Sequence, residues 1–515
     1  MKIFMRKNST LLITLLLIAV FLVLSSRGMS TQDFYITLLR SLSSGSVVFL
    51  VAAGFSLIFG LLDVLNLAHG TLYMIGAYIG WTVFVRPDTF VDLIAPVCLL
   101  LTGLTLTGTF KSLTTRVNLP PRPRRLVAIG LIALGIVAAA LLLKQYPVAM
   151  WDLENYTKGP VTYSFFADQN VRIPLEHVNF EKLSPIMAVI GLLASSAVIG
   201  LGIALLGGEM RSSKKTGWSG YIMFALLLVV AILTILFNTP LTEWLIKIDS
   251  TWLFLIAIVV AVMSGVGLGA GMETTLIRPL YSRPIYQLML TLGLSAIGVE
   301  MVQAIWGRPG FIMPRPSFVK GSGEGCPATS LAGWLDHKCA TIQFFDGRIR
   351  VYDEVLIPIL GIIVLIGVWL LLKRTRLGMV IRAGVQDRAM VEALGINVRR
   401  VFTLVFALGV GLATFGGILA APSTGLNTGM GASLLTAALI ALAIGGLTSY
   451  PGAALGSLLV GLVQQFIIKF GQIGFEIPFT DIVFKPSPPL VPASTVFLMV
   501  VVLLFLPGGI MGKKD

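Results

Sequence analysis

The stretch KRTRLGMVIRAGVQDRAMVEALGINVRR, residues 373–400, organises this chain, because it is the longest charged run between apolar blocks. It holds seven Lys and Arg residues against Asp387 and Glu392. Apolar residues recur at helical spacing within it, namely Ala383, Met390, Val391 and Leu394. This spacing predicts a short amphipathic helix over about Met379–Leu394.

The end of this helix is marked by Gly395, which stands where a left-handed C-terminal cap is needed. Asn397 follows and is expected to start the next segment. A helix of this kind between two membrane spans can dock a soluble partner. It can equally be a basic juxtamembrane loop that only sets orientation, and the spacing alone leaves both explanations open.

Composition gives the broad class. Of 515 residues, 56% are hydrophobic and 12% are charged, whereas globular proteins average roughly 25% charged residues. Apolar blocks of roughly 20 residues recur along the chain, which is the length needed to cross a bilayer. The sequence predicts an all-α, polytopic bundle of transmembrane helices in a lipid bilayer. The net charge of +14 is therefore attributed to membrane sidedness and not to nucleic-acid binding.

About fourteen spans are expected. The first is Leu11–Leu24, which we expect to be retained because Ser25-Ser26-Arg27-Gly28 is a poor signal-peptide cleavage site. The others are expected at Ser44–Leu62, Thr71–Val85, Val91–Phe110, Leu126–Leu143, Ser184–Leu206, Ser219–Phe237, Trp252–Met272, Tyr286–Trp306, Val355–Leu372, Val401–Ala421, Ala432–Ser449, Gly452–Phe470 and Ser494–Met511.

The basic residues predict the orientation of these spans. With the N-terminus inside, 22 of the 38 Lys and Arg residues fall in the segments expected to be cytoplasmic, which are 1–10, 111–125, 208–217, 273–285, 373–400 and 512–515. Basic residues concentrate on the cytoplasmic side of membrane proteins. Both termini are therefore predicted to be cytoplasmic.

Two long loops are then expected on the outer side, at 144–183 and 307–354. The second contains Cys326 and Cys339, with twelve residues between them. Outside the cytoplasm this pair can form a disulfide, and two free thiols are the alternative. His337 lies between the cysteines, but the spacing is too irregular for a zinc site, and no metal is predicted.

Residues 63–70, DVLNLAHG, interrupt two apolar blocks with polar side chains and no Lys or Arg. Such a stretch is typical of a broken or re-entrant helix, whose free backbone groups are satisfied inside the protein. Asn66, His69 and Gly70 are candidates for the translocation path. A packing network between helices explains Asn66 and His69 equally well.

Glu300 is the only acidic residue that we place well inside a span, and Gln303 follows one turn later. Ionisable groups in membranes usually face the bundle interior. The carboxylate could contact the ammonium group of a substrate. It could also be hydrogen-bonded to a neighbouring helix or lie near the outer interface.

The remaining patterns concern helix packing and contain no catalytic motif. Gly265, Gly267, Gly269 and Gly271 form interleaved GxxxG pairs, and Gly452 pairs with Gly456. These pairs predict close helix packing. The chain has no P-loop, no nucleophile elbow and no HExxH motif, so neither catalytic residues nor a bound cofactor are predicted on it.

Five stretches together resemble the membrane permease of branched-chain amino acid ABC importers of the LivH type. They are NLAHGTLYMIGAYIG (66–80), RPLYSRPIYQLMLTLGLSAIG (278–298), TRLGMVIRAGVQDRAMVEALGINVRRV (375–401), IALAIGGLTSYPGAALGSLLVGLVQ (440–464) and LFLPGGIMGK (504–513). The resemblance covers about residues 32–85 and 252–512.

This resemblance implies a permease subunit of an ATP-driven importer in a bacterial inner membrane. Its partners would be cytoplasmic ATPase subunits that carry ATP and magnesium, a second permease subunit and a periplasmic substrate-binding protein. It also implies that part of the opening stretch couples to the ATPase, namely Arg382, Asp387, Glu392, Ala393, Leu394 and Gly395.

The resemblance further implies a division of the chain into an extra N-terminal helix (1–31), a first part of the permease core (32–85), inserted helices (86–251) and a second part of the core (252–512). The expected cargo is a branched-chain or other hydrophobic amino acid. Urea, short amides or another small polar metabolite are alternatives. An ion-coupled secondary transporter and a membrane scaffold are the competing classes.

Overall fold

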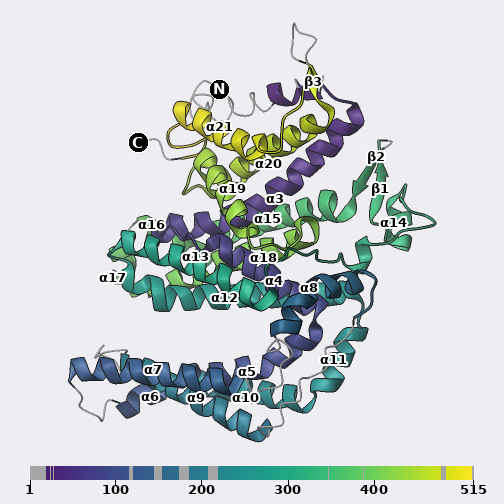
Figure 1. Cartoon of the computed structure of the whole chain (residues 1–515). Helices are drawn as coiled ribbons and strands as arrows, with labels where there is room; N and C mark the ends of the chain where they lie inside the picture. Colours follow the sequence, from purple (N-terminus) through teal and green to yellow (C-terminus); the bar gives the residue numbers. More distant parts are fainter. Residues whose placement is uncertain are drawn as a thin grey trace. The chain divides into compact units, whose positions relative to one another are not determined.

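A computed structural model describes residues 19–23, 25–26, 28–114, 120–143, 153–172, 185–206, 218–345, 347–386, 388–476 and 483–512. Contacts between residues divide the chain into two compact units (Figure 1). The first consists of Met1–Trp81 and Ser250–Asp515, and the second of Thr82–Asp249. Whether the second unit is an insertion relative to related permeases stays a prediction.

The first unit is a bundle of long apolar helices. They are α3 (Thr31–Leu62), α4 (His69–Val85, whose last turn belongs to the second unit), α12 (Ser250–Met272), α13 (Pro284–Trp306), α15 (Ile357–Arg374), α18 (Val398–Thr424), α19 (Met430–Gly445), α20 (Tyr450–Ile473) and α21 (Leu490–Phe505). Helix α3 packs against α15, α18, α19 and α20, and α12 packs along α18 (Figure 1). Helices α3 and α18 therefore form the centre of this unit.

The second unit is also helical. It contains α5 (Pro87–Thr105), α6 (Thr107–Thr114), α7 (Pro121–Leu143), α8 (Leu153–Asp168), α9 (Pro185–Leu206), α10 (Trp218–Leu236) and α11 (Asn238–Lys247). Helix α9 packs against α5, α6 and α7, and α5 also contacts α10 and α11. Buried polar groups connect these helices: Ser196 donates to the carbonyl of Leu100, and the amide of Asn238 donates to Asp92.

Two small antiparallel sheets accompany the helices. Strands β1 (Thr341–Phe344) and β2 (Gly347–Arg350) form a hairpin in the loop predicted to be outside. Strands β3 (Phe475–Glu476) and β4 (Val483–Phe484) form the second pair. The first loop also holds a 3-10 turn, η4 (Ser317–Val319), and a short helix, α14 (Leu331–His337). Of the two alternatives for Cys326 and Cys339, the structure shows the disulfide, with 5.5 Å between the two Cα atoms.

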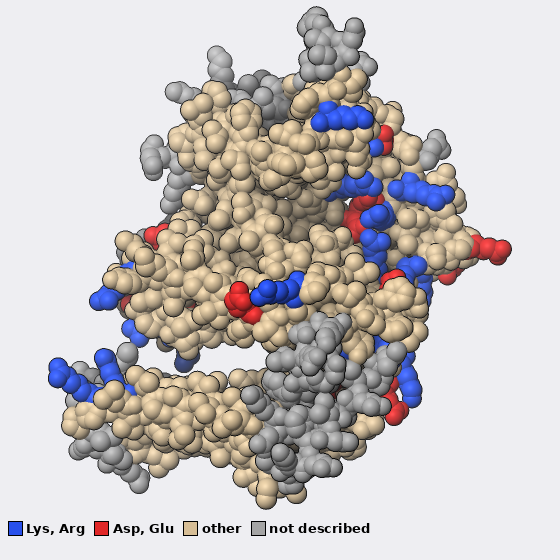
Figure 2. Space-filling model, in the orientation of Figure 1, with Lys and Arg blue, Asp and Glu red and all other residues tan. Residues whose placement is uncertain are grey.

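The helices are those of a multi-pass membrane protein. In the described part of the chain, nine helices are long and apolar enough to cross a bilayer, or ten if the α10–α11 pair, bent by 79°, is one span. Two shorter apolar helices are α19 and α21. Charged side chains are sparse on the face drawn in Figure 2. The count of fourteen spans is not confirmed, and the predicted first span, Leu11–Leu24, lies mostly outside the described residues.

Helices α3 and α18 approach each other so closely that their backbones touch. A Cβ atom on Gly54 would lie 2.3 Å from the carbonyl oxygen of Gly409, and one on Gly409 would lie 2.6 Å from the carbonyl oxygen of Gly54. Without water to drive apolar burial, helices in a bilayer associate largely through such close packing. Only one of the two predicted GxxxG pairs of α12 lies at a helix contact. Gly265 and Gly269 contact α18, whereas no atom of the described residues lies within 4 Å of the Cβ positions of Gly267 and Gly271.

We predict that Gly54→Ala destabilises the protein, because the new methyl group would force α3 away from α18. Overpacking of this kind costs about 1–3 kcal/mol. Gly267→Ala is the matched control, since nothing lies within 4 Å of its Cβ position and Ala favours a helix by up to about 1 kcal/mol. Thermal unfolding in detergent should show a lower Tm for the first variant only. Equal melting temperatures would contradict the packing.

The disulfide can be tested by counting accessible thiols. The chain has three cysteines, and Cys98 is free. Denatured protein treated with a polyethylene-glycol maleimide should gain one tag without reductant and three after reduction, as gel mobility would show. Three tags without reductant, in protein isolated from an oxidising compartment, would exclude the bridge.

Candidate functional site

The predicted amphipathic helix forms as two helices, α16 (Arg376–Gln386) and α17 (Arg388–Ala393). They are separated at Asp387, which lies outside the described residues. The first begins three residues earlier than expected, because the Thr375 hydroxyl accepts a hydrogen bond from the Gly378 N–H at 3.0 Å and caps the helix. Helix α16 packs against α3, α15 and α18.

The buried side of this segment differs from the predicted apolar stripe. Ile381 and Val391 are buried in a cluster with Leu61 of α3 and Phe402 of α18. Ala383 packs against this cluster, but the side chains of Met390 and Leu394 are exposed. Because α17 starts anew at Arg388, its apolar face does not continue that of α16.

The end of the segment has the predicted geometry. Gly395 adopts φ 79°, a left-handed conformation that glycine adopts without cost, and the Ile396 N–H reaches back to the carbonyl of Val391. The Asn397 side chain then caps α18 by accepting from the Arg400 N–H at 3.2 Å. Both sequence predictions are confirmed.

The candidate coupling residues lie mainly on the surface. Glu392, Ala393, Leu394 and Gly395 are all exposed around the end of α17. Arg382 is exposed too, and its guanidinium donates to the carbonyl of Leu372 in the last turn of α15. The segment is therefore anchored to α15 while its tip is open to solvent or to a partner chain.

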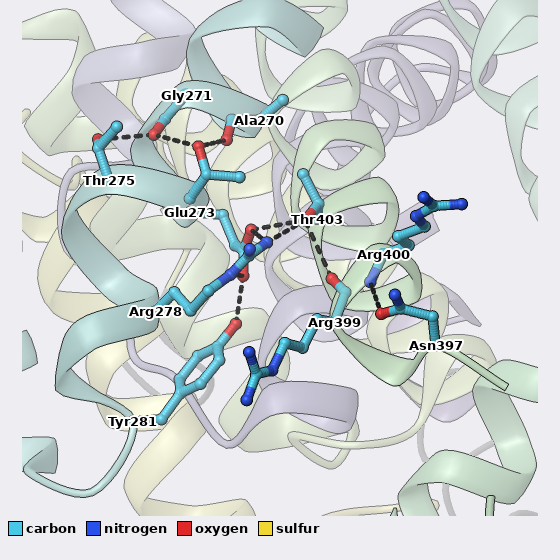
Figure 3. A network of polar contacts seen from close by, with 11 residues as sticks. Ala270, Gly271, Glu273, Thr275, Arg278, Tyr281, Asn397, Arg399, Arg400 and Thr403 are labelled. Atoms are coloured by element: carbon cyan, nitrogen blue, oxygen red, sulfur yellow. Dashed lines mark hydrogen bonds and ion pairs between the residues drawn. The ribbon is translucent and has the colours of Figure 1, made fainter. Parts of the chain in front are cut away.

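A buried carboxylate that the sequence did not single out lies beside this segment. Glu273 is fully buried and opens the π-helical turn η2 (Glu273–Ile277) at the end of α12. Its two oxygens accept from Arg278 at 3.1 and 2.7 Å, from the Tyr281 hydroxyl at 2.6 Å and from the Thr403 hydroxyl at 2.7 Å (Figure 3). Arg278 begins the 3-10 turn η3 (Arg278–Leu280).

This network ties α12 to the first turns of α18. Figure 3 shows Arg278 and Tyr281 on one side of the Glu273 carboxylate and Thr403 on the other. A buried charge is tolerated only when it is paired and hydrogen-bonded, which is the case here. The sequence predicts a cytoplasmic segment over residues 273–285. The signal that could have identified the network is an acid followed by Arg and Tyr, five and eight residues later, directly after an apolar block.

Glu300, unlike Glu273, is not buried. Its side chain is exposed near the end of α13, and Gln303 is only half-buried. Of the alternatives left open, the buried carboxylate is not observed, and a role of Glu300 and Gln303 in translocation stays a prediction. The sequence placed the residue within an apolar block but could not tell which side of the helix faces the bundle.

We predict that Glu273→Ala destabilises the protein by about 2 kcal/mol, because the Arg278 guanidinium loses its carboxylate partner. Tyr281→Phe removes one hydrogen bond and should cost about 1 kcal/mol. Glu243→Ala is the control: it breaks the Glu243–Lys247 pair, whose side chains are 60% and 76% exposed, and should cost under about 0.5 kcal/mol. Thermal unfolding would rank the three, and an unchanged Tm for Glu273→Ala would contradict the network.

A cavity of about 630 Å³ lies in the first unit, within the range of small-molecule sites. Its polar lining comes from α3, η5 (Val351–Leu356), α18, α19 and α20, with β2 and the α18–α19 turn at its edge. The polar residues are Arg40, Ser43, Ser44, Arg350, Asp353, Glu354, Ser423, Thr424, Asn427, Ser433, Gln464 and Gln465. The other lining residues are Val47, Val48, Tyr73, Ile357, Ala420, Met430, Leu434 and Ala437.

The cavity and the 373–400 segment lie at opposite ends of the same helices. Helix α15 runs from Ile357 at the cavity to Arg374 at the segment, and α18 runs back from Val398 to Thr424. At 1.5 Å per residue, α18 separates the two sites by roughly 35–40 Å.

Paired charges line one side of the cavity. Arg40 Nε donates to Glu354 Oε1 at 2.8 Å, and the backbone N–H of Arg350 donates to the other oxygen of Glu354. Asp353 accepts from Arg315 at 2.8 Å and from the Ser423 hydroxyl of α18. Glu354 is almost fully buried, with 2% of its side chain exposed.

The predicted path residues Asn66, His69 and Gly70 do not line this cavity. They are buried where α3 ends and α4 begins. His69 Nε2 lies 3.2 Å from the Val51 carbonyl, and a Cβ atom on Gly70 would meet the carbonyl of Gly431 on α19. These contacts agree with a packing network, whereas a role in translocation stays a prediction. Among the described residues, no cluster of His, Cys, Asp and Glu could hold a metal ion.

Comparison with known proteins gives a consistent result. The family described as "Branched-chain amino acid transport system / permease component" matches residues 37–248 and 241–507. The chain is 33% identical over 171 residues to the high-affinity branched-chain amino acid transport system permease protein BraD of Pseudomonas aeruginosa. The aligned residues make up 33% of this chain and 51% of BraD.

It is also 25% and 26% identical over 271 residues to the LivH permease proteins of Salmonella typhimurium and Escherichia coli K12, covering 52% of this chain and 78% of each relative. The chain thus spans about half the length of BraD and about three quarters of LivH. No solved structure matches it.

Proposed function

Because the chain belongs to the permease family of branched-chain amino acid transport systems, we propose that it forms the membrane pathway of an ATP-driven importer for branched-chain or other hydrophobic amino acids. One observation carries the proposal: α18 begins at an exposed, basic segment and ends at a cavity lined by polar and aliphatic residues. As a transport component of this family, the chain is not an enzyme.

The proposed assembly follows from the family. Cytoplasmic ATPase subunits would bind ATP and magnesium and dock on the 373–400 segment, whose tip at Glu392–Gly395 is exposed. A second permease, either another copy or a different chain, would complete the pathway, and a periplasmic binding protein would deliver cargo. The family supports a place in a bacterial inner membrane. The excess of Lys and Arg in the segments predicted to be inside supports cytoplasmic termini, and the apolar blocks of the sequence support about fourteen spans.

In this proposal ATP drives alternating access. Closure of the ATPase subunits moves the 373–400 segment, which is anchored to α15 through Arg382 and to α18 through the cap at Asn397. Both helices extend to the cavity, so their displacement changes its access. The energy source lies on another chain, and this chain contributes the connection between segment and cavity.

The competing functions differ in cargo or in energy source. A urea or amide permease would use the polar lining alone, whereas the aliphatic lining suits a hydrophobic side chain. An ion-coupled transporter needs a titrating acid in its path. Glu300 is exposed, and both Glu273 and Glu354 are paired with arginine, which does not favour that mechanism.

The first test is purification in mild detergent with identification of the bound chains. A stoichiometric P-loop ATPase, lost when residues 382–395 are disrupted, is the expected result. A single protein that moves leucine in vesicles without ATP would overturn the proposal.

We predict that Gly395→Val lowers leucine uptake roughly tenfold or more at normal expression. A β-branched residue is strained at φ 79° and would displace the end of the segment. Gly395→Asn is the matched control, because Asn adopts this conformation readily and no atom lies within 4 Å of the Cβ position among the described residues. Arg382→Glu should also block uptake without preventing membrane insertion. Normal uptake by both Gly395→Val and Arg382→Glu would remove the coupling assignment.

A further inference from the structure

We propose that the Arg40–Glu354 ion pair is the cavity's recognition element for a zwitterionic α-amino acid. The substrate carboxylate would bind Arg40, and the substrate ammonium would bind Glu354 and Asp353. This inference rests on the proposed function and deepens it, because it assigns the residues that bind the substrate. The comparisons with the family and its relatives name no such residues.

The charge of the cavity supports this assignment. Its lining contains two cations, Arg40 and Arg350, and two anions, Asp353 and Glu354. A third cation, Arg315, is not part of the lining and pairs with Asp353 at 2.8 Å. Because charges of both signs line the cavity, a cargo that carries a single charge would leave its own charge unpaired in a region of low dielectric. A zwitterion brings one charge of each sign and leaves the balance unchanged.

The geometry leaves a binding edge on Arg40. The pair is joined through Nε, and in the described part of the chain the terminal nitrogens of Arg40 make no hydrogen bond. The Arg40 side chain is 44% exposed although it lines the cavity. A guanidinium edge binds a carboxylate through two parallel hydrogen bonds, which a lysine cannot reproduce.

The acidic side is held in place before substrate binds. Asp353 and Glu354 are neighbours in the π-helical turn η5. The Arg350 N–H and the Ser423 hydroxyl donate to Glu354 Oε2 and Asp353 Oδ1. The remaining oxygens accept from arginine, Glu354 Oε1 from Arg40 and Asp353 Oδ2 from Arg315. An ammonium group has three donors and can bond to both carboxylates. On entry of substrate, the terminal nitrogens of Arg40 bind the substrate carboxylate while the ammonium group binds the two carboxylates, so that no charge is left alone.

The aliphatic part of the lining can contact the side chain of the substrate. Val47 and Val48 of α3 and Leu434 and Ala437 of α19 are aliphatic. An aliphatic side chain that leaves water for such a surface gains binding free energy in proportion to its area. A charged head group beside an aliphatic wall matches a hydrophobic α-amino acid, whereas urea has neither feature.

The test measures leucine uptake by proteoliposomes that contain the whole transporter, with ATP and saturating binding protein. Arg40→Gln and Glu354→Gln should each lower uptake about tenfold or more. The double variant, which carries both substitutions, separates recognition from structure, because two glutamine side chains can hydrogen-bond to each other and restore a purely structural contact. We expect the double variant to transport no better than the worse single variant.

The matched controls are Asp33→Asn and Lys469→Gln. They break another ion pair of α3, in which Lys469 of α20 contacts Asp33 outside the cavity lining. Both should keep normal uptake. Recovery of uptake in the double variant, Arg40→Gln with Glu354→Gln, would overturn the assignment.

A second measurement tests the ligand class directly. Thermal stability of the purified transporter is followed with millimolar leucine, with isopentylamine, which lacks the carboxylate, and with 4-methylpentanoate, which lacks the ammonium. Leucine alone should raise the Tm, and Arg40→Gln should abolish the rise. Equal stabilisation by the three compounds would refute zwitterion recognition. The proposed function would still stand if the wild-type transporter took up leucine. Absence of wild-type leucine uptake would refute both.

Discussion

The backbone contact between α3 and α18 is the constraint on which the first unit depends. Gly54 and Gly409 let the two longest helices of this unit meet without intervening side chains. In a bilayer, helices associate largely through such close packing, whereas in a soluble protein the hydrophobic effect drives their association. Because α3 and α18 both reach from the cavity to the 373–400 segment, their contact also fixes the distance between these two regions.

Buried charge is placed at those ends and nowhere along the described middle of α18. Glu273 lies beside the 373–400 segment, and Glu354 lies at the cavity. Each stands in a π-helical turn next to a long helix, η2 after α12 and η5 before α15. Such turns widen the helix and are frequent at functional sites. Each carboxylate is also paired with an arginine, which makes its burial tolerable.

Helix α18 contacts both acidic sites through hydroxyl groups. Thr403 in its second turn donates to Glu273, and Ser423 at its other end donates to Asp353, the neighbour of Glu354. A helix is stiff along its axis because every turn is hydrogen-bonded to the next. A movement at one end would therefore be carried to the other, as the proposed drive by an ATPase on another chain requires.

The sequence by itself determined the class of the protein, since apolar blocks long enough for a bilayer follow from composition. It also determined the local features that depend on neighbouring residues, such as the left-handed Gly395, the cap at Asn397 and the pairing of Cys326 with Cys339 as one of two outcomes. Only the tertiary structure decided which acids are buried. The sequence predicts loops for Glu273 and Glu354 and leaves the surroundings of Glu300 open, because the burial of a side chain depends on which face of its helix meets another helix. The cavity could not be predicted from the sequence either. Arg40 and Glu354 are 314 residues apart and meet only when α3, η5, α18, α19 and α20 pack together.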